Sequence, residues 1–105
     1  MGKSKMTKSD IVDIVFEDAE VKEYGLSRKE ISIVVGKFIE KLRESIEKLE
    51  HNDRIELRGF GTFGIKKRKA RVARNPKTGE EVMVPERKSP FFKAGREMKQ
   101  AIVGK

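Results

Sequence analysis

The sequence predicts an α+β fold within a single domain, which its length of 105 residues favours. Apolar residues recur at three- and four-residue steps through residues 8–50, and at every second residue from Arg54 onward. A strongly basic segment, residues 66–88, has turn-forming residues near its middle and is followed by a short stretch of helical spacing. These three observations predict two long helices, antiparallel strands with a protruding two-stranded β-arm, and a short C-terminal helix.

The first helix is expected to begin near Lys8, after a flexible basic tail at residues 1–6. Thr7 and Asp10 suit a helix N-terminus, because a hydroxyl accepts hydrogen bonds from free amides and a carboxylate is favoured at the positive end of the helix. The apolar positions that give this helix a buried face are Ile11, Val12, Ile14, Val15, Phe16 and Ala19. Gly25 ends the pattern.

Ser27 and Glu30 form an S-x-x-E capping box ahead of the strongest helical pattern in the chain. The apolar stripe behind this box consists of Ile31, Val34, Val35, Phe38, Ile39, Leu42, Ile46 and Leu49. Because the opposite face mixes acidic and basic residues, we expect the stripe to pack in a core or a dimer interface rather than on a membrane. Gly36 costs about 1 kcal/mol relative to alanine, so we expect it to permit a close approach by another element.

The period changes to two after the helix ends at residues 51–53. Ile55 and Leu57 alternate with charged residues, which predicts a short half-buried strand. A tight turn at residues 59–61 leads into a second strand near Thr62. Phe63 and Ile65 give that strand an apolar face, but the same face then becomes basic. The strand is therefore expected to leave the body of the protein and enter solvent.

The β-arm is expected at residues 66–88, with its turn at residues 74–79. Its nine basic residues are Lys66, Lys67, Arg68, Lys69, Arg71, Arg74, Lys77, Arg87 and Lys88, against three acidic ones. Val82 and Val84 restart the alternation on the returning strand, and Phe91 and Phe92 bring the chain back to the core. A short basic helix is expected within residues 93–103, beginning near Gly95.

The positive charge is concentrated in the second part of the chain. Residues 1–65 hold twelve Lys or Arg and thirteen Asp or Glu, whereas residues 66–105 hold thirteen and four, so the balances are −1 and +9. This local excess favours a surface for an anionic partner. The chain has no cysteine, and its only histidine, His51, lies at an expected turn. We therefore expect no catalytic site, metal or cofactor, and the lack of a long apolar segment predicts a cytoplasmic protein.

A two-stranded ribbon with so few apolar residues is marginal by itself, so we expect the arm to be disordered until an anion organises it. Duplex DNA is the first candidate, because its phosphates require several cations in a row. Pro76 could be an apolar wedge that parts base pairs, or it could only form the turn. An RNA-binding protein is the competing class, and a membrane-surface module is a weaker third.

The chain resembles the bacterial HU/IHF family of histone-like DNA-binding proteins. The motif residues that carry this resemblance are Gly59, Phe60, Phe63, Arg68, Arg71, Ala73, the run Asn75–Glu80, Pro90, Phe92 and Gly95. The resemblance extends from Thr7 to Val103. It implies an intertwined dimer with a helical base, a three-stranded antiparallel sheet above it, and two arms that bind and bend double-stranded DNA in the minor groove. It also implies an architectural protein of the nucleoid and not an enzyme.

The same resemblance implies which residues act. Those expected to bind DNA are Lys8, Lys66, Arg68, Arg71, Arg74, Asn75, Pro76, Lys77, Arg87, Lys88, Arg96 and Lys99, with Pro76 as the intercalating residue. Those expected in the dimer core are Phe38, Leu42, Phe60, Phe63 and Phe92. HU-type homodimers bind with little sequence preference, whereas IHF-type subunits pair with a paralogue and select a site. Residues 21–26 and the second helix are longer than in a typical HU, which we expect to alter the base and leave DNA contact intact.

Overall fold

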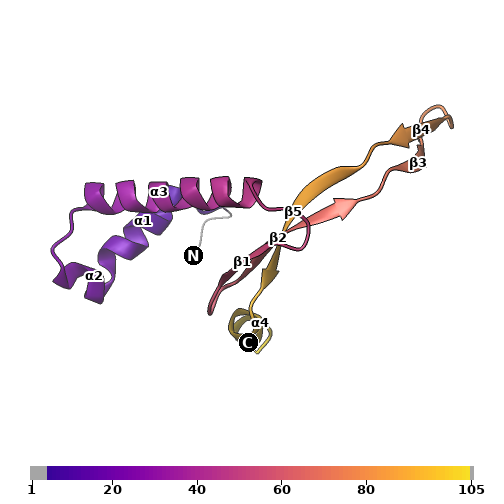
Figure 1. The fold of residues 1–105 in the computed structure, drawn as a ribbon. Coiled ribbons are helices and arrows are strands. Elements are labelled where there is room, and N and C mark those ends of the chain that lie inside the picture. The colour runs from indigo at the N-terminus through magenta and orange to yellow at the C-terminus, as the bar shows by residue number, and fades with distance from the viewer. Residues whose placement is uncertain (1–4, 105) are drawn as a thin grey trace. The chain divides into compact units, whose positions relative to one another are not determined.

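The computed structural model describes residues 5–104, and their helices and antiparallel strands confirm the α+β class (Figure 1). Residues 1–4, which make up most of the expected basic tail, lie outside the described residues. The chain divides into two compact units, one ending at Glu44 and the other beginning at Ser45. Within residues 5–104, no helix is both long and apolar enough to cross a membrane.

The first unit contains three helices, one more than the spacing of apolar residues predicts. They are α1 (Lys8–Glu17), α2 (Ala19–Glu23) and α3 (Arg28–Glu47), the last of which continues into the second unit. The expected first helix is interrupted because Asp18 has an extended backbone with φ −65° and ψ 133°. The Asp18 carboxylate accepts hydrogen bonds from the amides of Glu20 and Val21 at 3.0 and 3.1 Å. It therefore caps a new helix, and Ala19 belongs to α2.

The predicted capping box at the start of α3 is confirmed. The Ser27 amide donates to Oε1 of Glu30 at 2.8 Å, and the Glu30 amide donates to Oγ of Ser27 at 3.1 Å. The hydrogen bonds that the backbone amide and the side chain of Ser27 make to the Glu30 carboxylate lower its pKa below the ordinary value of 4.5. The box satisfies two amides that the first turn of a helix leaves without partners.

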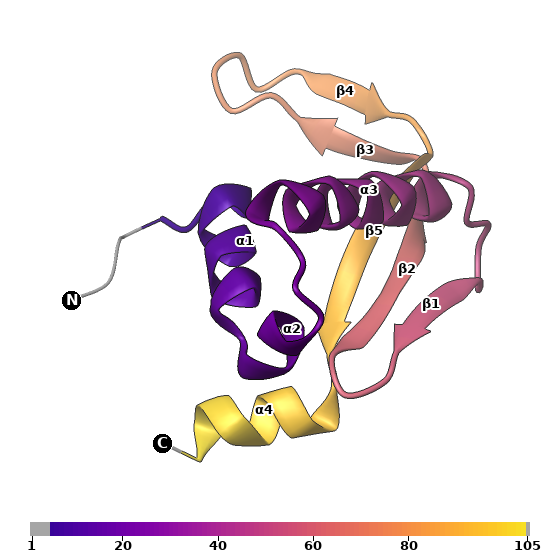
Figure 2. The ribbon, with the colours of Figure 1, turned by 90° about the vertical axis from the view of Figure 1, so that its left-hand side faces the viewer.

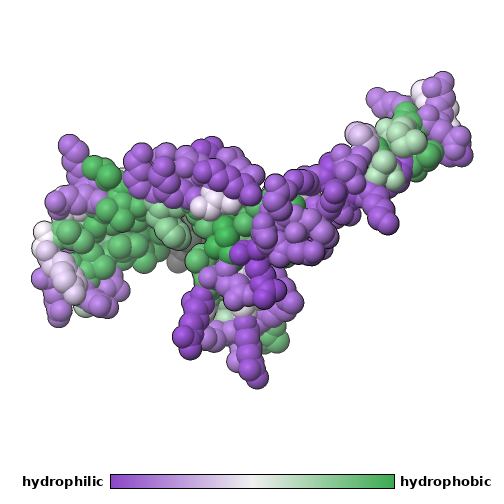
Figure 3. Space-filling view, viewed as in Figure 1, coloured by the Kyte–Doolittle hydropathy of each residue, from purple (hydrophilic) through white to green (hydrophobic). Residues whose placement is uncertain are grey.

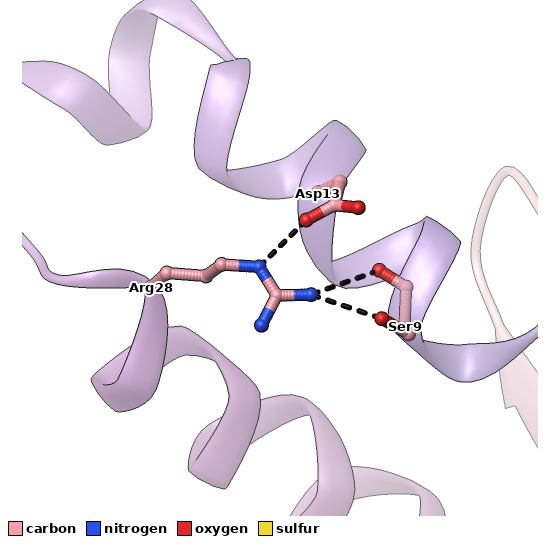
Figure 4. A network of polar contacts seen from close by, with 3 residues as sticks. All are labelled: Ser9, Asp13 and Arg28. Atoms are coloured by element: carbon pink, nitrogen blue, oxygen red, sulfur yellow. Dashed lines mark hydrogen bonds and ion pairs between the residues drawn. The ribbon is translucent and has the colours of Figure 1, made fainter.

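A polar network joins α1 to the start of α3 (Figure 4). Nε of Arg28 donates to Oδ1 of Asp13 at 2.6 Å, and one terminal nitrogen of Arg28 donates to Oγ of Ser9 at 3.0 Å. Because Ser9 and Asp13 are one helical turn apart on α1, a single guanidinium spans both. The network therefore links the first half of α1, which begins with Lys8, to the first residue of α3.

The apolar core of the first unit is small. Val12 and Ile31, at 1% and 4% exposure, are the only hydrophobic side chains of the described residues that are fully buried. Val34 and Phe38 lie on the apolar stripe of α3 but remain 67% and 55% exposed. Figure 3 shows apolar atoms gathered over this helical unit. The chain therefore leaves uncovered an apolar surface that a water-soluble protein normally buries.

The second unit is built on a three-stranded antiparallel sheet with the order β1-β2-β5. Its strands are β1 (Arg54–Leu57), β2 (Gly61–Arg68) and β5 (Arg87–Ala94). Phe63 pairs with Ile55 on one side and with Phe92 on the other. The rings of Phe60, Phe63 and Phe92 form a cluster with centroids 4.9 to 6.4 Å apart. We call the side of the sheet that carries this cluster the aromatic face.

The arm is a hairpin joined to the sheet by a gap in the hydrogen-bonded ladder (Figures 1 and 2). Its strands are β3 (Arg71–Arg74) and β4 (Glu81–Val84). Residues 69–70 leave the ladder after β2, and Pro85 and Glu86 leave it before β5. Proline has no amide hydrogen to donate, so the ladder fails where Pro85 should take part. The basic ribbon is thus two paired segments instead of the single one expected.

The last helix, α4, spans Arg96–Val103 and begins after Gly95, as predicted. Lys93 and Ala94, which precede the expected start of the helix near Gly95, belong to β5 and pair with Thr62 and Gly61. The backbone can continue as a strand there because Gly61 has no side chain to collide with the Phe92 ring. Lys93 is consequently a residue of the sheet.

Candidate nucleic-acid interface

The pairing of β2 with its neighbours separates the basic residues of the sheet onto two faces. Residues directly opposite each other across antiparallel strands lie on the same face. The side opposite to the aromatic face, here called the basic face, carries Arg54, Lys66, Arg68, Arg87 and Lys93. Phe91 lies among them, with Nζ of Lys66 5.5 Å from the centre of its ring. A row of cations beside an aromatic ring is a surface suited to a nucleic acid.

Arg68 and Arg87 stand directly opposite each other at the root of the arm. Like charges in this position repel, so the pair destabilises the ladder unless an anion lies nearby. Among residues 5–104, no carboxylate forms an ion pair with either guanidinium. The two guanidinium groups are both exposed. The root of the arm therefore holds two uncompensated cations on the basic face.

Lys67 and Lys88 form a second opposed pair, on the aromatic face, but each of them has an acidic partner. Nζ of Lys88 donates to Oε2 of Glu50 at 2.8 Å, and Nζ of Lys67 lies 3.8 Å from Oε1 of Glu86. The hydrogen bond to Glu50 raises the pKa of Lys88 above its ordinary value. Lys88 thus lies on the aromatic face with an acidic partner, whereas its neighbour Arg87 lies on the basic face and forms no ion pair with a described carboxylate.

The hairpin of the arm also has two different sides. Arg71 pairs with Val84, whereas Arg74 pairs with Glu81 on the opposite side. Asn75, Pro76 and Lys77 form the turn, in which Pro76 is exposed and Asn75 is half-buried. Exposed Val72, Val82 and Met83 supply the apolar atoms seen at the end of the arm in Figure 3. The tip therefore carries a solvent-exposed proline, Pro76, between the cations Arg74 and Lys77.

The remaining predicted residues lie outside the arm. Lys8 is the first residue of α1, and its Nζ would lie 3.5 Å from a methyl group added at Gly36. Gly36 was expected to admit a close approach, and the neighbour within reach is this lysine. Arg96 and Lys99 are exposed on α4.

The residues predicted for the dimer core are only partly covered by the chain itself. Phe38, Phe60 and Phe92 are exposed, and Leu42 and Phe63 are half-buried. Phe38 and Leu42 lie on α3, and the three other rings form the cluster of the aromatic face. Residues 5–104 therefore leave each set as an apolar surface that is only partly covered.

Sequence reasoning missed two residues of the basic face, Arg54 and Lys93. The alternation around Ile55 places Arg54 opposite to the apolar side, but only the register across β2 shows that it shares a face with Lys66. Nε of Arg54 is held 2.7 Å from Oε2 of Glu56. Within the described residues, no three His, Cys, Asp or Glu side chains are grouped so that they could hold a metal ion.

Comparison with known proteins assigns the chain to a family. The family model described as "Bacterial DNA-binding protein" matches residues 6–103. Integration host factor subunit beta of Haemophilus influenzae (strain PittEE) is 41% identical over 97 residues, which cover 92% of this chain and 96% of that protein. The subunit of the same name from Hahella chejuensis is also 41% identical over 97 residues and is covered to 92%.

Two solved structures resemble the fold. The Anabaena HU–DNA cocrystal structure matches with a TM-score of 0.76 at 32% identity, covering 95% of this chain and all of the other (100%). The solution structure of a mutant of transcription factor 1 matches with a TM-score of 0.59 at 25% identity, covering 95% and 93%. Because the family model spans nearly the whole chain and the named relatives match at least 92% of it, this chain belongs to the HU/IHF family of bacterial DNA-binding architectural proteins, which are not enzymes.

Proposed function

We propose that this protein binds double-stranded DNA in the minor groove through its β-arms, bends it, and helps to compact the bacterial nucleoid in the cytoplasm. The observation that carries this proposal is the opposed pair Arg68 and Arg87, which no acidic group of the described chain neutralises. A polyanion that lies over the basic face relieves their repulsion and releases its own counterions. Minor grooves attract arginine in particular, because narrow grooves concentrate negative potential.

The contacts follow from the position of each group. Lys66, Arg68 and Arg87 would bind phosphates at the root of the arm, and Arg71, Arg74, Asn75 and Lys77 would follow the groove. Pro76 would enter between two base pairs and kink the duplex, as apolar wedges of architectural proteins do. Lys8, Arg96 and Lys99 would hold flanking phosphates. Lys88 was expected to bind DNA as well, but its bond to Glu50 on the aromatic face argues for a smaller contribution.

We further propose that the active form is an intertwined dimer, in which both units of the chain make one domain. The support is the shortage of buried side chains, since only Val12 and Ile31 are fully buried among the described hydrophobic residues. A second copy would cover the stripe of α3 and the aromatic cluster. Sedimentation equilibrium of the purified chain tests for a homodimer directly, and a monomer at micromolar concentration would contradict the homodimer and leave only pairing with a paralogue.

A homodimer with little sequence preference is the first candidate, and an IHF-type subunit that pairs with a paralogue and selects a site is the second. The second is favoured by the relatives named integration host factor subunit beta. The purified single chain distinguishes them. A homodimer binds random duplexes alone with nearly uniform affinity, whereas an IHF-type subunit requires its partner for tight, selective binding.

The deciding experiment compares a straight duplex, a nicked or gapped duplex and a structured RNA of equal length. Bending a short site costs on the order of several kcal/mol, so DNA that is already flexible should bind more tightly than straight duplex. Pro76→Ala should reduce the bend angle, measured by energy transfer between the DNA ends, more than it reduces affinity. Equal affinity for straight and nicked DNA would contradict the wedge, and a preference for RNA would refute the proposal.

A further inference from the structure

The turn at the end of the arm is closed by five hydrogen bonds within residues 74–80. Two join backbone groups: the Asn75 amide donates to the Glu80 carbonyl at 2.8 Å, and the Gly79 amide donates to the Asn75 carbonyl at 2.7 Å. These bonds bring the two ends of the turn together on either side of Pro76.

Three side chains complete the turn. Oδ1 of Asn75 accepts from the Lys77 amide at 2.8 Å, directly across Pro76. Oγ1 of Thr78 accepts from the Glu80 amide at 3.2 Å. A terminal nitrogen of Arg74 donates to the Gly79 carbonyl at 2.6 Å. Short polar side chains that bond backbone amides two residues ahead are the usual means of stabilising a turn.

Backbone conformation adds to this order. The proline ring restricts φ of Pro76, and Gly79 has a φ of +77°, which side-chain-bearing residues rarely adopt. The ladder is interrupted at residues 69–70 and at Pro85, whereas the hydrogen bonds that close the tip all lie within residues 74–80. The order of the tip therefore does not depend on pairing between the hairpin and the sheet.

We propose that Thr78 is a positioning residue which, with Asn75, holds Pro76 as a preformed wedge before DNA binds. The inference rests on the proposed function, because a wedge has a role only if the arm enters DNA. A group that is already ordered in its bound conformation does not lose that conformational entropy on binding. Thr78 is not among the residues that the sequence predicts to bind DNA, and among the described contacts its hydroxyl bonds only within the turn.

Substitutions at Thr78 test the positioning role independently of electrostatic attraction to DNA, because they change no charge. Thr78→Val keeps the shape and removes the acceptor, whereas Thr78→Ser keeps the acceptor and removes a methyl group. Both variants are tested as full-length protein. The first measurement is the mobility of the Gly79 and Glu80 amides in the absence of DNA, by nuclear magnetic resonance relaxation. The second is the affinity of each variant for a straight duplex and the bend that it produces.

We expect Thr78→Val to increase mobility at both amides and to weaken binding to straight duplex by roughly two- to tenfold, the shift that loss of one neutral hydrogen bond produces. Thr78→Ser should remain within about twofold of the wild-type affinity, because it keeps the hydroxyl acceptor. The dependence of affinity on salt should be unchanged in both, since no cation is lost.

Two results would overturn the inference. One is a Thr78→Val protein with wild-type tip mobility and bending, and the other is a Thr78→Ser protein as impaired as Thr78→Val. A wild-type protein that neither binds nor bends duplex DNA would instead refute the proposed function. If the wild type bends DNA but Thr78→Val and Thr78→Ser have the same tip mobility and bending as each other, only the positioning role is refuted.

Discussion

Arg87 and Lys88 are neighbours on β5 with the same charge, yet they point to opposite faces of the sheet. Arg87 faces Arg68 without an acidic partner, whereas Lys88 donates to Glu50 at 2.8 Å. The substitutions Arg87→Gln and Lys88→Gln therefore remove equal charge from adjacent positions. If DNA lies on the basic face, only the first should remove a phosphate contact.

The magnitude follows from counterion release. Each phosphate neutralised contributes about 0.9 to the slope of log affinity against log salt concentration. Arg87→Gln should therefore reduce that slope by about 0.9, and the weakening between 50 and 200 mM salt should become about 3.5-fold smaller. Lys88→Gln should change the slope by less than about half that amount, because its ammonium is already paired with Glu50 and only its long-range field is lost.

Fluorescence anisotropy of a labelled nicked duplex, titrated at four or more salt concentrations, measures both slopes. Circular dichroism on the same samples checks that each variant is folded. Two outcomes would refute the assignment of faces. Equal reductions for the two variants would mean that the register does not decide which cation meets DNA, and a larger reduction for Lys88→Gln would place DNA against the aromatic face.

Two further predictions concern stability. A methyl group added at Gly61 would lie 2.5 Å from the Phe92 ring, so Gly61→Ala should lower the free energy of unfolding by about 1–3 kcal/mol. Gly36→Ala is its control, and should raise it by about 0.5–1 kcal/mol, because alanine loses less backbone entropy in a helix and the added methyl group would meet only the flexible Lys8 side chain, at 3.5 Å. Thermal unfolding measures both, and a destabilised Gly36→Ala would reveal another element packed there. Glu30→Ala should be less stable than wild type at neutral pH. Since the folded-state pKa of Glu30 lies below 4.5, this difference should persist above pH 4.5 and vanish as the pH falls through the lowered pKa; a difference that is independent of pH would contradict the capping role of its carboxylate.

Local patterns were enough to predict most elements of this chain. Three of these patterns depend only on neighbours in sequence: the capping box at Ser27, the alternation around Ile55 and the glycine before the last helix. They can therefore be predicted without knowledge of the tertiary structure. The break at Asp18 was missed because a carboxylate that caps a helix looks the same in sequence as one on an exposed helical face. The gap in the ladder of the arm at Pro85 was missed for a similar reason, since the effect of a proline on pairing depends on the strand opposite.

The candidate site divides in the same way. Composition and charge identify the basic segment, and the residues around Asn75 identify its turn, because both are properties of a short stretch of chain. Only the tertiary structure shows that Arg87 and Lys88 lie on opposite faces of the sheet and that Arg54 and Lys93 belong to the basic face. It also shows that Lys88 donates a hydrogen bond to Glu50. The physical reason is that a face is defined by the register between strands distant in sequence, and a one-residue shift would exchange every side chain between the two faces.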